Sequence, residues 1–192
     1  MTDTMADTVG SDSAAQPDPE STTTSMPTAK PEVVTRSPDA VGEGVRPEGF
    51  GTTLVRITAA DGTVCDVCLW HARDSAQRGR GLMGVTDLGE PVGMAFTWDD
   101  PLEGAFVMIG TPTPLSIAWF AADGSHVAET DMEPCLIDDT AACERYRPDG
   151  SYTLAIEMFQ GELAKVGIGP GSRAEILRLV EPGAEAICPL LD

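Results

Sequence analysis

The chain has 192 residues, and its 31 Asp and Glu residues outnumber its 12 Lys and Arg residues, which gives a formal net charge of −19. So much negative charge repels the phosphates of nucleic acids and anionic membrane surfaces, and neither is an expected partner. The sequence contains no run of about 18 apolar residues, so we expect no transmembrane helix.

Residues 1–49 are rich in Thr, Ser, Pro, Ala and acidic residues and contain no aromatic side chain. Such a composition buries too little apolar surface to offset the chain entropy lost on folding, so we expect a disordered acidic tail. The tail shows neither the basic start and apolar run of a secretion signal nor a cysteine for lipid attachment. A linker from a surface anchor, a processed leader and a solubilising tail of no specific role all fit this composition.

Residues 50–181 change to short apolar runs separated by turn residues, which predicts one mainly β (α+β) domain, followed by a short tail over 182–192. We expect a compact β-barrel-like or two-sheet domain with one or two short helices. The tetrapeptide Ala-Ala-Asp-Gly occurs at 59–62 and 121–124, and its Asp-Gly pair favours hairpin turns. The predicted strands lie at 52–58, 63–71, 93–98, 105–109, 115–120, 125–130, 152–159 and 173–180.

Two other segments have helical signals. Residues 73–83 predict a short helix or turn, with Asp74 or Ser75 as its N-cap and Gly79 and Gly81 near its end. Residues 160–171 predict one helical turn closed by Gly167.

The stretch FVMIGTPTPLSIAWF, residues 106–120, is interrupted by Pro112 and Pro114. Proline has no N–H donor, so this break is not the middle of a paired strand. We interpret the stretch as two core strands joined by a stiff turn, in which Thr111 is the polar group of most interest.

Cys135 and Cys143 flank a short loop, and we predict a disulfide between them, with reduced cysteines as the alternative. Such a bond places the domain outside the reducing cytosol. Cys65 and Cys68 form a C-x-x-C pair, but within a strand they point to opposite faces, which does not favour redox chemistry. The spacing of these two cysteine pairs is atypical for the ligands of a zinc site. Cys188 either pairs with Cys68 or stays unpaired.

Methionines and histidines are the other residues with chemical potential. Thioethers bind copper(I), but methionine more often fills gaps in cores. His71 and His126 follow predicted strands and are interpreted as surface residues, although His126 could pair with Ser116 or Cys135 as a hydrolytic centre. The methionines in question are Met83, Met94, Met108, Met132 and Met158.

Three blocks carry a family resemblance: RGLMGVTDLGEPVGMAF (80–96), FVMIGTPTPLSIAWFAADG (106–124) and YTLAIEMFQGELAKVGIGPGSR (152–173). Together they resemble the bacterial and archaeal domain-of-unknown-function family 192 over roughly residues 52–180. The DMEPC block with its following Cys and Tyr resembles an actinobacterial-type branch. The resemblance implies a compact, barrel-like β domain, often behind a signal peptide or lipid anchor, with no established activity.

One motif departs from the family. Its commoner form reads Phe-Trp-Met-Lys-Asn-Thr followed by Pro-Leu-Asp. The Trp, Lys, Asn and Asp of that form are replaced here by Val107, Ile109, Gly110 and Ser116, which argues against a catalytic role carried by this motif. The residues that match are Phe106, Met108, Thr111, Pro114 and Leu115.

We therefore predict a non-enzymatic envelope or extracellular domain that binds a ligand or an envelope protein as a monomer, with no cofactor and no catalytic residue assigned. A hydrolase acting on envelope material and a copper-binding protein are the alternatives. The family and the cysteine pair imply an extracytoplasmic location, and the lack of a visible signal leaves the cytoplasm as the other one. The predicted binding surface consists of Arg80, Gly81, Met83, Met108, Thr111 and Pro114.

Overall fold

The computed structural model describes residues 33–34 and 44–182, which belong to one compact unit. The predicted tails at 1–49 and 182–192 therefore lie mostly outside the described residues. Residues 44–49, which composition assigns to the first tail, pack onto the domain: Arg46 forms an ion pair with Asp87 at 2.8 Å, and the Val45 N–H donates to Thr86 Oγ1 at 3.0 Å.

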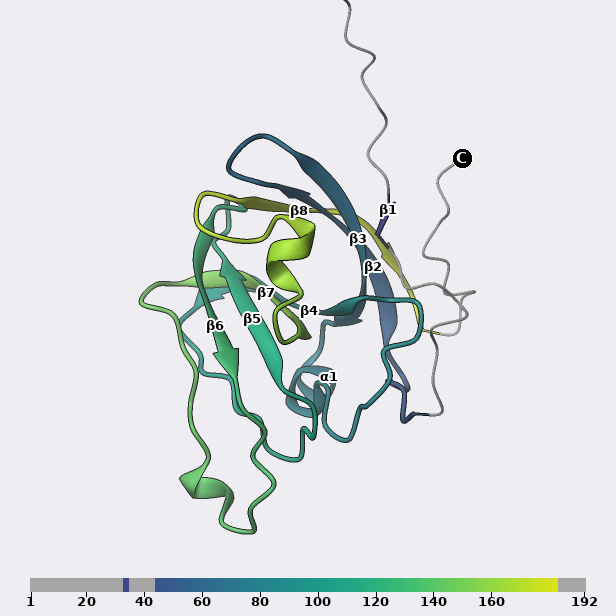
Figure 1. Ribbon diagram of the computed structural model, residues 1–192, viewed down its shortest axis with the longest axis vertical. Helices are drawn as coiled ribbons and strands as arrows, with labels where there is room; N and C mark the ends of the chain where they lie inside the picture. Colours follow the sequence, from purple (N-terminus) through teal and green to yellow (C-terminus); the bar gives the residue numbers. More distant parts are fainter. Residues whose placement is uncertain (1–32, 35–43, 183–192) are drawn as a thin grey trace, which may run out of the picture. The chain divides into compact units, whose positions relative to one another are not determined.

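The strands of the described chain form one mixed β-sheet with the order β6–β5–β7–β4–β3–β2–β8 (Figure 1). Neighbouring strands are antiparallel except for β3 and β4, which are parallel, and a short strand β1 that pairs parallel with β3. The strands are β1 (Val33–Val34), β2 (Gly51–Thr58), β3 (Val64–Ala72), β4 (Gly93–Leu102), β5 (Leu115–Phe120), β6 (His126–Met132), β7 (Tyr152–Phe159) and β8 (Arg173–Val180).

The mainly β prediction is confirmed, but the barrel is not closed. Within the described residues, the edge strands β6 and β8 share no ladder and meet through an isolated bridge between Ser125 and Arg173. The His126 N–H donates to Ser172 O at 3.1 Å, and the Ala174 N–H donates to Gly124 O at 2.9 Å. The expected barrel or pair of sheets is therefore a single open sheet whose edges are fastened at one end.

One predicted strand is wrong. Residues 105–109 form no ladder, because their neighbours are loop residues: Phe106 bridges Tyr146, and Ile109 bridges Cys135. The other predicted strands exist, and β7 and β8 have the predicted bounds.

Helical segments are short, as predicted. Helix α1 (Ser75–Arg80) begins at Asp74, whose carboxylate accepts the Gln77 N–H at 2.8 Å and completes a capping box. The 3-10 turn η3 (Leu163–Val166) ends at Gly167 in the left-handed conformation. A second 3-10 turn, η2 (Thr140–Ala142), lies in the loop between β6 and β7.

The sheet has apolar side chains on both faces. Along β5, Ile117 and Trp119 belong to a first core cluster, whereas Ala118 and Phe120 belong to a second. The second cluster also contains apolar residues of η3 and β2. The first cluster packs against the connection between β3 and β4 and the loops around Met108 and Tyr146. The face of the sheet that carries the first cluster also carries the candidate site.

The two Ala-Ala-Asp-Gly segments form the same turn. Gly62 and Gly124 have φ angles of +86° and +81°, and each donates its N–H to the carbonyl three residues earlier. The carboxylates of Asp61 and Asp123 accept the N–H two residues later. The N–H of Thr63 lowers the pKa of Asp61, whereas the pKa of Asp123 is lowered first by the hydroxyl of Ser125 and then by its N–H. The Asp-Gly prediction of two hairpins is confirmed.

Gly62→Ala and Gly124→Ala test the contact between the turn before β6 and the edge strand β8. Both alanines carry the cost of a positive φ, about 1–2 kcal/mol. An added Cβ at Gly124 lies 2.5 Å from Ala174 O, whereas nothing lies within 4 Å at Gly62. We expect urea denaturation to show a loss of roughly 1 kcal/mol in the free energy of unfolding for Gly62→Ala and at least about twice that for Gly124→Ala. Equal losses would show that the contact at Ala174 contributes nothing.

Candidate ligand-binding pocket

A cavity of about 620 Å³ lies against the face of the sheet that carries the first core cluster. Its volume falls within the range of small-molecule sites. We call this cavity the α1 pocket, because one wall is helix α1 and the residues that follow it. Its lining residues are Ser75, Arg78, Gly79, Arg80, Gly81, Leu82, Met83, Phe96, Trp98, Leu102, Gly104, Ala105, Phe106, Val107, Ile109, Thr111, Tyr152 and Glu157.

Four aromatic rings line the α1 pocket and contact one another. Phe96 and Phe106 pack edge to face with their centroids 5.1 Å apart, and Trp98 and Tyr152 do so at 5.3 Å. The Trp98 and Phe106 centroids are 6.2 Å apart, which joins the two pairs. Edge-to-face contacts of this kind stabilise aromatic clusters, so the wall is a connected surface rather than four separate side chains.

Glu157 is the one carboxyl group that lines the α1 pocket. It lies in the middle of β7, opposite Met94 of β4 and Ile117 of β5, and its side chain is buried. No hydrogen bond or ion pair joins this carboxyl to another side chain in the described part of the protein. Burial raises its pKa to about 8, so the group carries a proton at neutral pH.

The two arginines at the pocket are engaged elsewhere. Arg78 donates to the carbonyl oxygens of Arg73 and Thr97, and its guanidinium lies 5.1 Å from the Trp98 ring centroid. Arg80 is exposed, donates to Glu48 O at 3.0 Å and lies 5.9 Å from the Phe50 centroid. Neither forms an ion pair with Glu157, which explains why burial alone sets the pKa of that carboxyl.

Three hydroxyl groups complete the polar lining, those of Ser75 at the start of helix α1, Thr111 and Tyr152. Thr111 is buried, and its backbone N–H donates to Met108 O at 3.1 Å. The Tyr152 hydroxyl lies at the backbone of Gly104, and burial raises its pKa to about 12. The pocket thus combines an aromatic wall with a buried acid and three hydroxyl groups.

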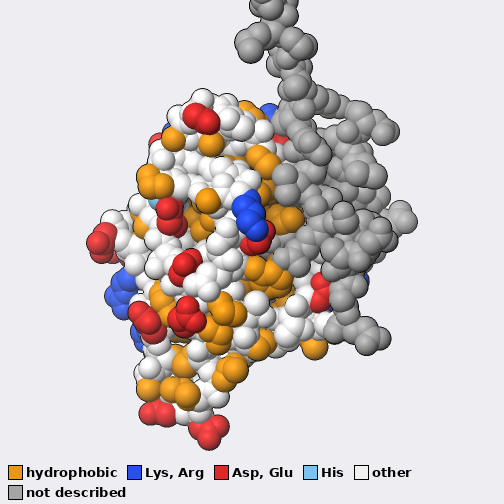
Figure 2. All heavy atoms as spheres, in the orientation of Figure 1, with side chains coloured by type: hydrophobic (Ala, Val, Ile, Leu, Met, Phe, Trp, Pro, Cys, Tyr) orange, Lys and Arg blue, Asp and Glu red, His pale blue; other side chains and the backbone are white. Residues whose placement is uncertain are grey.

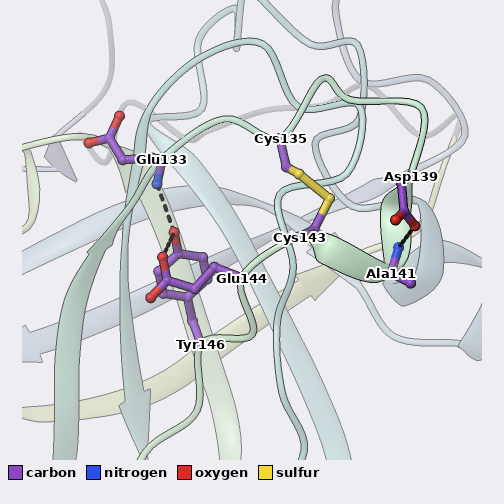
Figure 3. The surroundings of a disulfide bond; sticks show 7 residues. All are labelled: Glu133, Cys135, Asp139, Ala141, Cys143, Glu144 and Tyr146. Atoms are coloured by element: carbon purple, nitrogen blue, oxygen red, sulfur yellow. Dashed lines mark hydrogen bonds between the residues drawn. A yellow bond between two sulfur atoms is a disulfide. The ribbon is translucent and has the colours of Figure 1, made fainter.

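The loop wall of the pocket is attached to a disulfide-closed loop. Cys135 and Cys143 form the predicted disulfide, and Figure 3 shows it beside Tyr146. The Gly110 N–H donates to Cys135 O at 3.0 Å, and the Cys135 N–H donates to Met108 O at 3.1 Å. On the other side of the disulfide, Phe106 and Tyr146 exchange two backbone hydrogen bonds at 2.7 and 2.9 Å. The disulfide therefore braces the segment that carries Phe106 to Thr111.

Tyr146 anchors the far side of this loop. Its hydroxyl donates to Glu144 at 3.1 Å and accepts the Glu133 N–H at 3.1 Å (Figure 3). The tip of the loop is apolar, with Leu136 and Ile137 exposed by 65% and 52%. Apolar and acidic side chains gather at that end of the unit in Figure 2.

The structure brings together four of the six residues predicted for the binding surface. Arg80, Gly81, Met83 and Thr111 line the α1 pocket. The other two, Met108 and Pro114, do not: Met108 is buried in the first core cluster, and Pro114 accepts the Gln160 N–H at 3.1 Å. A role in binding stays a prediction for all six.

The sequence reasoning missed Glu157, Trp98 and Tyr152. A signal for the first was present, because Glu157 is the single charged residue of the apolar strand YTLAIEMF. Such a residue in a strand buried on both faces indicates either a buried partner or a ligand.

The predicted surface histidines are wrong. His71 is 5% exposed, with Nε2 at 2.8 Å from Thr97 Oγ1, and its pKa is lowered by burial and then by the charge of Arg73. The side chain of His126 is 8% exposed and faces the carboxylate of Glu129. Both residues belong to paired strands, β3 and β6, whose neighbours cover them.

Ser116 and His126 do not form a hydrolytic pair. Ser116 Oγ donates to Asp131 at 2.5 Å and accepts the Gly161 N–H at 3.0 Å. His126 pairs with Phe120, at the other end of the β5–β6 ladder from Ser116. Four residues of strand separate the two positions by about 13 Å.

The cysteines and methionines weighed for metal binding have other positions in the structure. The disulfide uses two of the four cysteines weighed for zinc, and among the described residues no three His, Cys, Asp or Glu side chains form a metal-binding group. Met158 belongs to the second core cluster, Met83 is exposed, and the remaining three methionines fill the first cluster. A pairing of Cys68 with Cys188 involves a residue outside the described part.

No helix in the described part of the chain has the length and apolar character needed to span a bilayer.

Comparisons with known proteins give a fold and no activity. The family model of domain-of-unknown-function family 192, described as an uncharacterised ACR, matches residues 56–176. A crystal structure of a candidate transcription regulator from Sinorhizobium meliloti 1021 is 22% identical with a TM-score of 0.58, over 68% of this chain and 97% of that one.

A second crystal structure, of a protein of unknown function from Novosphingobium aromaticivorans DSM 12444, is 25% identical with a TM-score of 0.56, over 74% of this chain and 99% of that one. No curated protein matches this chain. These likenesses support the fold of the domain.

Glu157→Gln tests the buried acid through the pH dependence of stability. The folded protein keeps the Glu157 proton up to about pH 8, whereas the unfolded chain releases it near its ordinary pKa of 4.5. Stability is therefore lost as the pH rises through this window, by up to about 1.4 kcal/mol per pH unit. We expect chemical denaturation to show this decline in the wild type and not in Glu157→Gln. The exposed control Glu103→Gln should keep the decline, and a parallel pH profile for Glu157→Gln and wild type would contradict the assignment.

Replacing Cys135 and Cys143 together by serine tests whether the disulfide holds the segment that carries Phe106 to Thr111. Loss of a loop closure of this size lowers the free energy of unfolding by about 2.5 kcal/mol in the chain-entropy treatment. Because the same loop holds the 104–111 segment, amide exchange there should speed up more than exchange in β2. Uniform protection across both regions would show that the disulfide does not hold the pocket wall.

Proposed function

Because the chain belongs to domain-of-unknown-function family 192, which has no assigned activity, we propose its function from the α1 pocket: the domain binds a small organic ligand and performs no catalysis of its own. The single observation that carries this proposal is the carboxyl of Glu157, which is buried at an open cavity and has no protein partner among the described residues.

A buried polar group without a partner lowers stability by a few kcal/mol, and native proteins keep few of them. A ligand with one polar group directed at Glu157 removes this penalty on binding. The apolar body of such a ligand would cover the rings of Phe96, Phe106 and Trp98, which supply most of the contact area.

A binding role fits the pocket better than an enzymatic one. Acid–base or nucleophilic catalysis needs a second reactive group within hydrogen-bond reach of the first. The hydroxyls of Thr111 and Tyr152 line the cavity, but no base activates either one, and both guanidiniums are held by carbonyl oxygens and rings. A hydrolase acting on envelope material therefore has no observation in its favour. The methionine positions give none for a copper-binding protein.

The disulfide supports a location outside the reducing cytosol, since such bonds persist in oxidising compartments. We propose an envelope or extracellular setting in which the ligand is a free small molecule or a group on an envelope component. The description of the Sinorhizobium meliloti protein as a candidate transcription regulator belongs to that protein. A net charge of −19 gives no support for contact between this chain and nucleic-acid phosphates.

Ligand binding is testable by ¹H–¹⁵N NMR with a library of small organic fragments. We expect shifts to concentrate on the amides of Gly81, Phe106 and Thr111 and on the Trp98 indole. Thr111→Ala should weaken the best fragment by about tenfold, which corresponds to roughly 1.4 kcal/mol. Arg80→Ala should shift the affinity of charged fragments, weakening anionic ones and strengthening cationic ones.

Arg147→Ala is the matched control, because this exposed arginine lines a different cavity beside β6. Its fragment profile should equal that of the wild type. Shifts that avoid the pocket, or unchanged profiles in both pocket variants, would remove the proposed site.

A further inference from the structure

Among the described residues, no cationic group lies beside Glu157 in the α1 pocket, and this indicates which class of ligand the pocket takes. We propose that the pocket selects organic ammonium ions, compact amines whose charged nitrogen pairs with Glu157 while their carbon skeleton lies against the aromatic wall. This inference rests on the proposed binding function and specifies the chemistry of its ligand.

The first argument is the state of the acid. A buried carboxylate is stable only beside a cation or several hydrogen-bond donors, and otherwise the group takes up a proton. Glu157 has neither kind of partner in the described structure, so its protonated form dominates when the pocket is empty. An ammonium ion supplies both the charge and the N–H donors that the protein does not.

The second argument is the aromatic wall. Phe96, Trp98, Phe106 and Tyr152 line the cavity together with the acid, and Phe96 lies on the same face of the sheet as Glu157, two residues beyond its partner Met94. Ring faces attract cations by about 0.5–2 kcal/mol each, depending on how fully the cation is desolvated. A carboxylate among aromatic rings therefore favours a cation over a neutral ligand of equal size.

The charged and titratable groups that line the pocket are few. Helix α1 contributes Arg78 and Arg80, β7 contributes the Tyr152 hydroxyl besides Glu157, and neither β4 nor the 104–111 segment contributes a charged side chain. The two guanidiniums oppose a cation. Arg80 is exposed, so water and ions screen its charge, whereas the half-buried Arg78 is turned to the Thr97 carbonyl and the Trp98 ring. At long range the net charge of −19 attracts cations to the protein.

Binding of an ammonium ion should change the protonation state of Glu157. The bound state needs the carboxylate, so each binding event below about pH 8 releases the Glu157 proton. Affinity then rises by about tenfold per pH unit toward pH 8 and levels off above it. A neutral ligand that accepts a hydrogen bond from the protonated acid gives the opposite trend, with affinity falling as the pH rises.

The experiment compares benzylammonium with benzyl alcohol, two probes of nearly equal shape. Isothermal titration calorimetry on the full chain, from about pH 6 to about pH 8 and in buffers of different ionisation enthalpy, yields both the affinity and the protons released. We expect benzylammonium to bind at least about tenfold more tightly than benzyl alcohol at the upper pH, with close to one proton released at the lower pH.

Two variants complete the design. Glu157→Gln should lose the preference for benzylammonium and the proton release, and its fold is checked by NMR. Glu103→Gln removes the same formal charge from an exposed position next to the pocket wall and should keep both. The pH dependence and proton release are measured on the wild type, so the test stands even where Glu157→Gln folds poorly.

The outcomes separate the two proposals. Equal affinity for both probes, or affinity for benzylammonium that falls as the pH rises, overturns the ammonium class while leaving the pocket as a binding site. A benzylammonium preference that survives in Glu157→Gln overturns the role of this acid. If neither probe nor any fragment shifts the pocket resonances, both the ammonium class and the binding function fall.

Discussion

The pairing of β7 on both sides is the constraint from which the site follows. This strand lies between β4 and β5 and forms ladders with each, so its backbone cannot rotate to expose a chosen side chain. Alternation along the strand then places Glu157 on the face with Ala155, against the first core cluster. The sheet holds an acid in an apolar layer, and the cavity beside it is what makes that arrangement tolerable.

The remaining walls of the pocket are held by contacts that do not involve Glu157. Arg78 and Arg80 bind carbonyls and rings at the edge of the pocket, and the disulfide loop holds the Phe106 segment through its backbone. Charge and rigidity are thus supplied by different parts of the chain. For the proposed binding role, walls held in this way lower the entropy lost when a ligand binds.

Local patterns predicted most of the sheet, whereas contacts between distant segments decided the rest. Alternation and Asp-Gly turns located β2, β3 and β5 to β8, and cysteine spacing located the disulfide. The predicted strand at 105–109 failed because its partners come from the loops around Cys135 and Tyr146, which no local pattern pairs with it. Glu157 was overlooked because alternation gives the face of a side chain and not what covers that face. Four residues of the predicted binding surface line the pocket, whereas Met108 lies in the first core cluster.

The parallel pairing of β3 and β4 has an architectural consequence. Two parallel neighbours cannot be joined by a hairpin, so the chain must travel back across the sheet before β4 begins. Residues 73–92 make that return, and they contain helix α1 and the Arg80–Met83 wall. The α1 pocket therefore takes one of its walls from a connection that supplies no rung of the ladder. Changes of length or composition in this connection would therefore reshape the pocket without removing a strand from the sheet.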